Sequence, residues 1–166
     1  MTGPAGALPT GRFDGREAFR QLVRDALQHA EREGWAELLL CDANFHDWPL
    51  GEQAVVQTLD QWARSGRRLT LLAGEFDTIV RQHSRFRQWR VRWDHIVTCR
   101  KAAAAYTQDV PSAIWSPHWV LERRDPLRCI GVAGFEPERR VLLRESLDEW
   151  LERKSSSSFP ASTLGL

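Results

Sequence analysis

The sequence is poor in several features, and each shortage excludes a class of protein. Its 166 residues contain three cysteines, too few and wrongly spaced for a disulfide framework or a zinc ribbon. The formal net charge is +1, so nothing draws the whole molecule towards nucleic acid or an anionic membrane. No apolar run approaches the roughly 20 residues that a membrane-spanning helix needs, and the first eight residues, MTGPAGAL, lack the basic start of a secretory signal. We therefore expect a cytoplasmic protein with no membrane span and with buried thiols.

Motifs of the common nucleotide enzymes are also absent. There is no GxSxG nucleophile elbow, no phosphate-binding glycine loop and no dinucleotide fingerprint, so we expect no cofactor. Three metal-ligand residue types, Asp42, His46 and Asp47, do follow one apolar run closely. Their spacing matches no metal motif, however, and Asp47 stands just before Pro49, as a residue that caps a helix would. A helix cap is the favoured interpretation, and we expect no metal site.

The pattern along the chain predicts a single α/β domain over residues 13–154. Residues 1–12 carry Gly and Pro without periodicity, which is typical of a flexible leader, and the low-complexity residues 155–166 predict a disordered tail. Apolar periodicity predicts helices at 17–34, 49–65, 76–90 and 137–153, strands at 36–41, 69–73 and 91–99, and a hairpin of 118–122 and 127–133 around the turn 123–126. Residues 101–112 are expected to form a loop. Strand–helix–strand units are normally parallel, so we expect a mixed, mostly parallel sheet with helices on both faces.

The last helix has its own apolar pattern. It is expected to turn five side chains inward: Val141, Leu142, Leu147, Trp150 and Leu151.

The hairpin carries the sharpest functional clue. From His118 the chain reads HWVLERRD, and residues 130–135 then read IGVAGF. This segment resembles the signature of the phospholipase D-like superfamily, HxKxxxxD followed by GS and an Asn, with His118 and Asp125 at the positions of its His and Asp. The resemblance covers roughly residues 36–152 and implies one half of a phospholipase D-like three-layer sandwich with a C-terminal hairpin. The chain is also similar to uncharacterised bacterial proteins of this fold that have no assigned activity.

The departures from that signature bear on catalysis. Val120 replaces the Lys, Val132 the Ser and Gly134 the Asn. In the family, the His acts as nucleophile or general acid, the Lys and Asn bind phosphate, and a working site needs two such motifs. A phosphodiester attacked without a cationic clamp has no group to neutralise its developing charge. We therefore expect His118 and Asp125 to be relics of the motif and the family's catalysis to be lost.

A basic strip, defined as Arg81–Lys101, offers a second kind of site. It contains six arginines, one lysine, two histidines and two interleaved tryptophans with a single acid, a mixture that can hold phosphate and stack bases. Three residues of the strip, Arg92, His95 and Arg100, join His118 as candidate phosphate ligands. A solvated basic face lying over a buried aromatic stripe explains the same pattern and is favoured.

Three functional hypotheses remain open. The first is a non-catalytic interaction module that binds a phosphate-containing ligand or a protein partner, with a homodimer as one form of it. The second is a dimeric phosphodiesterase or nuclease that uses His118, with arginines from residues 92–100 replacing the missing Lys. The third is a nucleic-acid binder that uses the basic strip, which the near-zero net charge disfavours.

Overall fold

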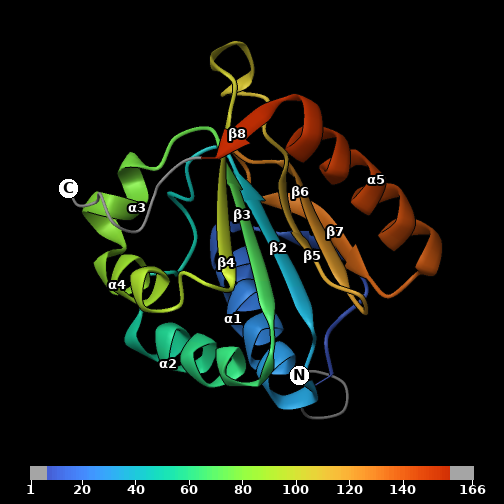
Figure 1. The fold of residues 1–166 in the computed structure, drawn as a ribbon. Coiled ribbons are helices and arrows are strands. Elements are labelled where there is room, and N and C mark those ends of the chain that lie inside the picture. The colour runs from blue at the N-terminus through green and yellow to red at the C-terminus, as the bar shows by residue number, and fades with distance from the viewer. Residues whose placement is uncertain (1–6, 158–166) are drawn as a thin grey trace.

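An eight-stranded sheet runs through the molecule in the order β1-β7-β6-β5-β2-β3-β4-β8 (Figure 1). The structure is a computed structural model and describes residues 7–157. Its strands are, in chain order, β1 (Gly11–Asp14), β2 (Glu37–Asp42), β3 (Arg68–Ala73), β4 (Val97–Ala102), β5 (Ser112–Trp115), β6 (Val120–Asp125), β7 (Ile130–Gly134) and β8 (Ser155–Ser157).

The sheet is mixed, but most of its pairings are antiparallel. Only β2, β3 and β4 run parallel to one another, while every other neighbouring pair is antiparallel. The expectation of a mostly parallel sheet is therefore wrong. The reason is that β5, β6 and β7 follow one another through turns too short for the crossover that parallel strands require, and β1 and β8 each add one more antiparallel pair.

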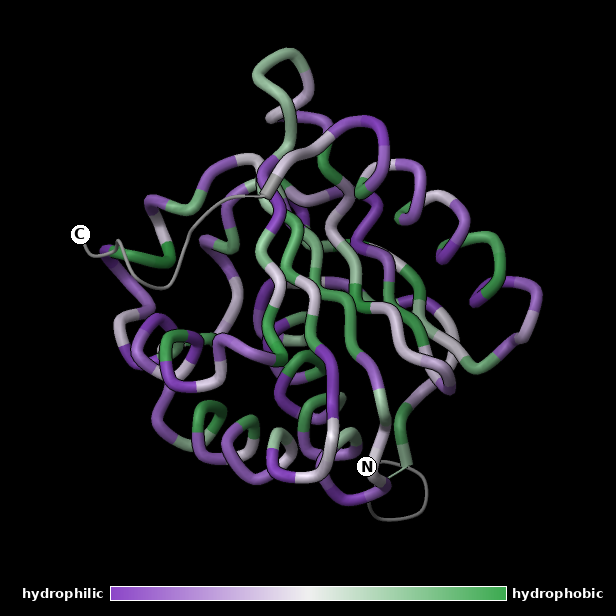
Figure 2. Tube along the Cα trace, viewed as in Figure 1, coloured by the Kyte–Doolittle hydropathy of each residue, from purple (hydrophilic) through white to green (hydrophobic). Residues whose placement is uncertain are grey.

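Helices cover the two faces of the sheet unequally. They are α1 (Arg16–Glu33), α2 (Gln53–Trp62), α3 (Asp77–Gln82), α4 (Ser84–Arg92) and α5 (Pro137–Arg153). The first four helices share one core with the sheet, whereas the smaller core on the opposite face receives helical side chains from α5 alone. In Figure 2, the central strands are mostly hydrophobic, and α5 is hydrophilic along most of its length. The layers are thus those of an α/β sandwich with helices on both faces, as the sequence predicts.

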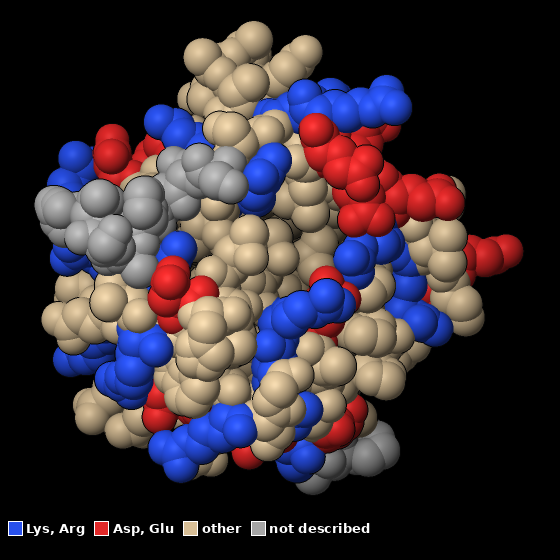
Figure 3. All heavy atoms as spheres, in the orientation of Figure 1, with Lys and Arg blue, Asp and Glu red and all other residues tan. Residues whose placement is uncertain are grey.

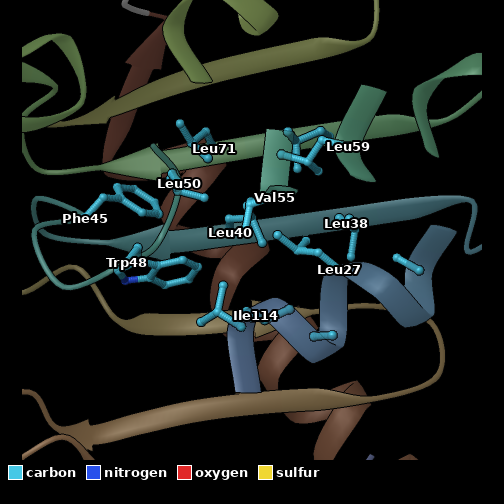
Figure 4. Packing of buried hydrophobic residues seen from close by; sticks show 14 of the residues in the cluster. Leu27, Leu38, Leu40, Phe45, Trp48, Leu50, Val55, Leu59, Leu71 and Ile114 are labelled. Carbon is cyan, nitrogen blue, oxygen red and sulfur yellow. The ribbon is translucent and has the colours of Figure 1, made fainter. Parts of the chain in front are cut away.

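The first helix and strand lie close to where the periodicity predicts them. Gly34 follows α1 in the left-handed conformation, with φ 71°, and donates its N–H to the carbonyl of Ala30. Leu38 and Leu40 of β2 pack against Leu27 of α1 in the larger core (Figure 4), while the alternate residues of β2 face the smaller core. Burial on both faces explains why this strand reads as a continuous apolar run.

Two predicted helices differ from the observed ones. The helix expected at 49–65 begins only at Gln53, because Pro49 lies in a preceding turn, and it ends in a 3₁₀ turn at Ala63–Ser65. The helix expected at 76–90 breaks at His83, whose φ of −121° and ψ of 53° are not helical. The chain becomes helical again in α4, which continues to Arg92. The strand expected at 91–99 therefore begins later, at Val97, as β4.

The segment expected as a loop, 101–112, holds more structure than its sequence suggests. It contains a 3₁₀ turn at Ala104–Tyr106, and its last residue begins β5, which sequence patterning does not predict. The predicted hairpin is present, but its turn lies further along the chain than expected. β6 continues through Asp125, and the turn lies at 126–129.

In α5, only part of the predicted inward face is correct. Leu143, Leu147 and Trp150 are buried, but Val141 and Leu142 are 56% and 67% exposed. The helix therefore contacts the sheet along a narrower stripe than the apolar pattern indicates.

Both ends of the described chain add to the sheet. Gly11 and Arg12, within the expected flexible leader, pair with β7, and Ser155–Ser157, within the expected disordered tail, pair with β4. Hydrogen bonding to an otherwise open strand edge orders these short polar segments, which have no apolar pattern of their own. The rest of the two expectations, at 1–6 and 158–166, lies outside the described residues.

Within residues 7–157, no helix is long and apolar enough to cross a membrane. Cys41, Cys99 and Cys129 are buried and form no disulfide, which confirms the prediction of buried thiols. Burial raises the pKa of Cys99 to about 11 and raises the pKa of Cys41 as well, so both are thiols at neutral pH.

Leu40 and Leu142 test the contrast between the core and the exposed side of α5. Leu40 is fully buried and Leu142 is 67% exposed. We expect Leu40→Ala to lower the free energy of unfolding by about 2–5 kcal/mol and Leu142→Ala to change it by less than about 0.5 kcal/mol. Chemical denaturation measures both, and equal losses in the two variants would contradict the placement of α5.

Candidate functional site

The motif histidine lies in the short turn between β5 and β6, not on a strand. The hydroxyl of Ser116 holds this turn: it accepts the backbone N–H of His118 at 3.1 Å and that of Trp119 at 2.8 Å, and it donates to the Trp119 carbonyl at 2.7 Å. His118 is exposed, and its ring centroid lies 5.7 Å from that of the buried Trp35. This contact places His118 at the amino end of β2, the edge opposite to the carboxyl ends of the parallel strands.

Two other motif positions meet across the hairpin. Val120, at the position of the family's Lys, pairs in register with Gly134, at the position of its Asn. The ladder thus brings these two positions together, but neither side chain can bind phosphate. Val120 is fully buried and packs in the core beneath α5.

Asp125 lies at the other end of β6 from His118. Its carboxylate accepts the backbone N–H of Arg128 at 3.1 Å and so closes the turn that leads to β7. The five residue steps of β6 alone span about 17 Å. The two residues that match the motif therefore lie at opposite edges of the sheet and do not meet within one chain.

The remaining candidate phosphate ligands are placed apart from His118. Arg92 ends α4 and pairs with Asp60 of α2 at 2.8 Å, and the exposed His95 stacks near Trp93. Arg100 lies on β4 and donates to the carbonyls of Leu151 and Ser155, at the junction of α5 and β8. Two strands separate β4 from β5, which is a distance of about 14 Å. The structure does not bring these residues together with His118.

The basic strip is largely engaged in structural contacts. Trp89 is fully buried, and the indole N–H of Trp93 donates to Asp60 at 2.8 Å. Arg90 is 4% exposed, donates to Asp94 at 2.7 Å and contacts Cys99. A buried indole cannot stack on a base, which favours the interpretation of a basic face over an aromatic core.

Two of the three metal-ligand candidates at the end of β2, Asp42 and Asp47, are held by an arginine that sequence reasoning missed, whereas His46 is exposed. Arg123 of β6 donates to Asp42 at 2.9 Å and to Asp47 at 2.9 Å, while its Nε donates to Ser112 at 3.0 Å. Asp47 is therefore an ion-pair partner and not the cap of α2, whose first residue is Gln53. Among the described residues, no group of three or more His, Cys, Asp or Glu side chains is arranged to hold a metal ion.

The Arg123 cluster is almost fully buried. Arg123 is 5% exposed and Asp42 is 3% exposed, and the guanidinium lies 4.3 Å from the ring centroid of Phe19. Burial opposes the charge on Arg123, but Asp42 and the hydrogen bonds of Cys129 and Asp47 outweigh it and raise the pKa of Arg123. No sequence motif marks this cluster, because Asp42 and Arg123 are 81 residues apart.

Backbone strain gathers around the same cluster. Among the described non-glycine residues, only Phe45 and Cys129 have positive φ, at 61° and 54°. Phe45 donates its N–H to Asp42 at 2.8 Å and accepts Nε2 of His83 at 2.9 Å, while the Cys129 sulfur lies 3.3 Å from Arg123. The ion cluster and His83 thus hold both loops in conformations that the chain alone disfavours.

A cleft of about 810 Å³ opens between α5 and the edge of β6. Its walls come from the loop at 108–111, from β5 and β6, and from the first half of α5. The charged residues that line it are Asp109, Glu122, Arg123, Arg124, Glu136, Glu138 and Arg139. Because Asp42 and Asp47 neutralise Arg123, four acids face two bases and the cleft is net acidic. Sequence reasoning missed this cleft, although the apolar residues at 141–143 are a signal for it.

Comparison with known proteins places the fold. No family model and no curated protein matches the chain. Among solved structures, it is similar to phosphatidylserine synthase of Haemophilus influenzae Rd KW20, with a TM-score of 0.58 and 12% identity over 88% of this chain and 38% of that one. It is also similar to polyphosphate kinase of Porphyromonas gingivalis, with a TM-score of 0.55 and 14% identity over 96% of this chain and 25% of that one. Both have folds of the phospholipase D superfamily. The chain shares that fold.

A third similar structure is TrmBL2, an archaeal chromatin protein described as showing a novel mode of DNA binding. Its TM-score is 0.65, with 12% identity over 95% of this chain and 57% of that one. The chain thus spans little more than half of this neighbour and less of the other two. At these identities the likeness is one of fold alone.

The buried cluster makes Arg123 a sensitive position. Arg123→Met leaves the buried Asp42 without a cationic partner, so we expect it to lower the free energy of unfolding by about 3–5 kcal/mol. The neighbouring Arg124→Met serves as control, because the Arg124 side chain is 62% exposed and its ion pair with Glu122 spans 3.7 Å. We expect a change below about 1 kcal/mol for the control. Chemical denaturation at neutral pH compares the two, and similar losses would contradict a structural role for the cluster.

His83 gives the protein a pH-dependent stability. Burial, together with the nearby Arg20 and His46, outweighs the hydrogen bond to Phe45 and lowers the pKa of His83 below its usual 6.5. As the pH falls below about 6.5, the unfolded chain binds this proton before the folded one does, so the folded state loses stability. We expect unfolding midpoints in urea to fall between pH 6.5 and 5 in the wild type and to fall less in His83→Gln. Parallel pH profiles for the two proteins would be inconsistent with a buried, neutral His83.

Proposed function

We propose that this chain is a non-catalytic interaction module with a phospholipase D-like fold. The observation that carries the proposal is the pairing of Val120 with Gly134, at the two positions where the family binds phosphate. Val120 is fully buried beneath α5, so its position cannot present a cation to a ligand. A phosphodiester at this place would lack the charge stabilisation on which phosphoryl chemistry depends.

The surroundings of His118 support the same proposal. Arg140 of α5 donates to the carbonyl of Pro117, the residue before His118, and to the carbonyl of Phe135, so backbone oxygens occupy its guanidinium. Among the described residues, no hydrogen bond or ion pair joins a cation to the His118 ring, and no arginine of 92–100 reaches it. The dimeric phosphodiesterase is therefore the weaker hypothesis.

Between the two ligand classes, the proposal favours a protein partner over a phosphate-containing molecule. The large cleft is net acidic, which repels phosphate, and exposed apolar side chains lie beside it. The three buried free thiols agree with a reducing compartment, so the proposal includes a cytoplasmic location. Association of two copies is one form that this module can take.

Nucleic-acid binding is a second candidate, favoured by the similarity to a chromatin protein that binds DNA. The basic strip of this chain would be the surface for it. Against this, Trp89 is buried and Arg92 is paired with Asp60, which leaves little of the strip arranged for phosphates or bases. The interaction module is the better supported of the two.

Hydrolysis of an activated aryl phosphodiester tests the proposal. We expect the wild type, His118→Ala and the control His46→Ala to give the same background rate, because no side chain neutralises the charge that develops on the phosphate. Turnover that His118→Ala alone abolishes would refute the proposal and establish a compensated active site. Release of the nitrophenolate-type product is followed by absorbance.

A further inference from the structure

The sheet face on the α5 side is only partly covered. On the opposite face, Phe13, Leu121 and Ala133 of β1, β6 and β7 are all buried. On the α5 side of the same three strands, Ile130 and Val132 are only half-buried, and Arg12 is exposed. The smaller core, to which α5 contributes, includes residues of β2 to β6, and within residues 7–157 it includes none from β7 or β1. We call the uncovered surface, with the adjoining cleft, the open face.

The open face has an apolar centre. Ile130 and Val132 lie on β7, the middle strand, and pair in register with charged residues on both sides: Val132 with Arg12 and Glu122, Ile130 with Asp14. The exposed Leu142 of α5 lines the cleft, and so does Glu122, which pairs in register with Val132. An apolar strip with charged borders is typical of an interaction surface.

The width of the open face fits one helix. β7 is two strands from β5, which α5 covers, and this is a separation of about 10 Å. Packed helices lie about 8–10 Å apart. A helix placed over β7 would therefore contact α5 along the cleft and complete the layer that α5 begins.

The charges around the cleft select the kind of helix. Arg124 pairs with Glu122 and Arg139 with Glu136, which leaves Asp109 and Glu138 without an ion pair among the described residues. In Figure 3, acidic side chains gather over the upper half of α5, the half that leads to β8, and basic side chains lie over its lower half. The occupant that complements this surface carries basic residues on either side of an apolar stripe.

We infer that the open face binds a basic amphipathic helix of a partner protein, packed beside α5 with its apolar stripe on Ile130, Val132 and Leu142. This inference rests on the proposed function, since it names the surface and the partner class of the interaction module. It assigns no role to His118, so phosphodiester hydrolysis and helix binding report on the two proposals separately.

A synthetic peptide tests the inference on the full chain. The first peptide, the probe, is a fluorescein-labelled 14-residue peptide of leucine and lysine whose leucines are spaced to form one helical face. The second peptide, the control, has the same composition, but its leucines do not fall on one helical face. We expect saturable binding of the first peptide by fluorescence anisotropy and binding at least about tenfold weaker for the second, because only the first forms an apolar stripe.

Two charge reversals on α5 form a matched pair. Glu138 lines the cleft, whereas Glu149 is exposed on the same helix outside it. We expect Glu138→Lys to weaken binding about three- to tenfold and Glu149→Lys to weaken it less than about twofold. Leu142→Lys, at an exposed position that the fold does not need, is expected to weaken it at least about tenfold.

Three results would overturn the inference. Equal weakening by Glu138→Lys and Glu149→Lys would reveal a diffuse attraction to the carboxylates of α5 rather than a site. Absence of saturable binding would exclude this partner class. Sedimentation that shows a dimer, dissociated by Leu142→Lys, would assign the open face to a second copy of this chain. None of these binding results bears on catalysis at His118. The hydrolysis assay therefore tests the proposed function separately from the inference.

Discussion

The ion cluster of Arg123, Asp42 and Asp47 is the interaction on which the arrangement of this molecule depends. It joins the end of β2, the loop after it, the start of β5 and the C-terminal hairpin, four segments that no continuous stretch of chain holds together. A buried guanidinium is costly unless it is paired with opposite charge and hydrogen-bonded, and here two carboxylates, a hydroxyl and the Cys129 sulfur accept from it. The same contacts fix the carboxyl edge of β2, where open α/β sheets usually bind ligands. In this chain that place is filled by the protein itself.

The ion cluster lies at a different place in this fold from the positions that match the phospholipase D motif. The topology is retained, but the positions that would carry chemistry are apolar or close turns, and the chief ion cluster of the hairpin points to the opposite face. A shared fold does not fix a shared function, because function depends on the residues of a site. In this structure one face of the sheet is thinly covered at β7 and β1.

How far the sequence predicts this structure depends on whether local patterning decides each element. α1 follows from the helical spacing of its apolar residues and from Gly34, which ends it, and β2 and β3 follow from their apolar runs. β1, β5 and β8 are short and owe their existence to neighbouring strands, and the break at His83 comes from a bond to Phe45, 38 residues away. In the site, His118 and Asp125 could be located by spacing, but their separation along β6 and the role of Arg123 arise from tertiary contacts. The open face exists because, among the described residues, the core beneath α5 includes none from β7 or β1. Local sequence patterns predict helices but not which strands they cover.

The two outermost strands have a further consequence. β1 has four residues and β8 has three, and β8 consists of serines alone. Long, flat, apolar sheet edges recruit strands from other molecules and seed fibres, whereas short polar edges give an incoming strand little to bind. The eight-stranded sheet therefore ends on both sides in segments that discourage growth by further strands. Contact with another molecule through such an edge would bury few backbone groups, whereas the sheet face beside α5 presents side chains.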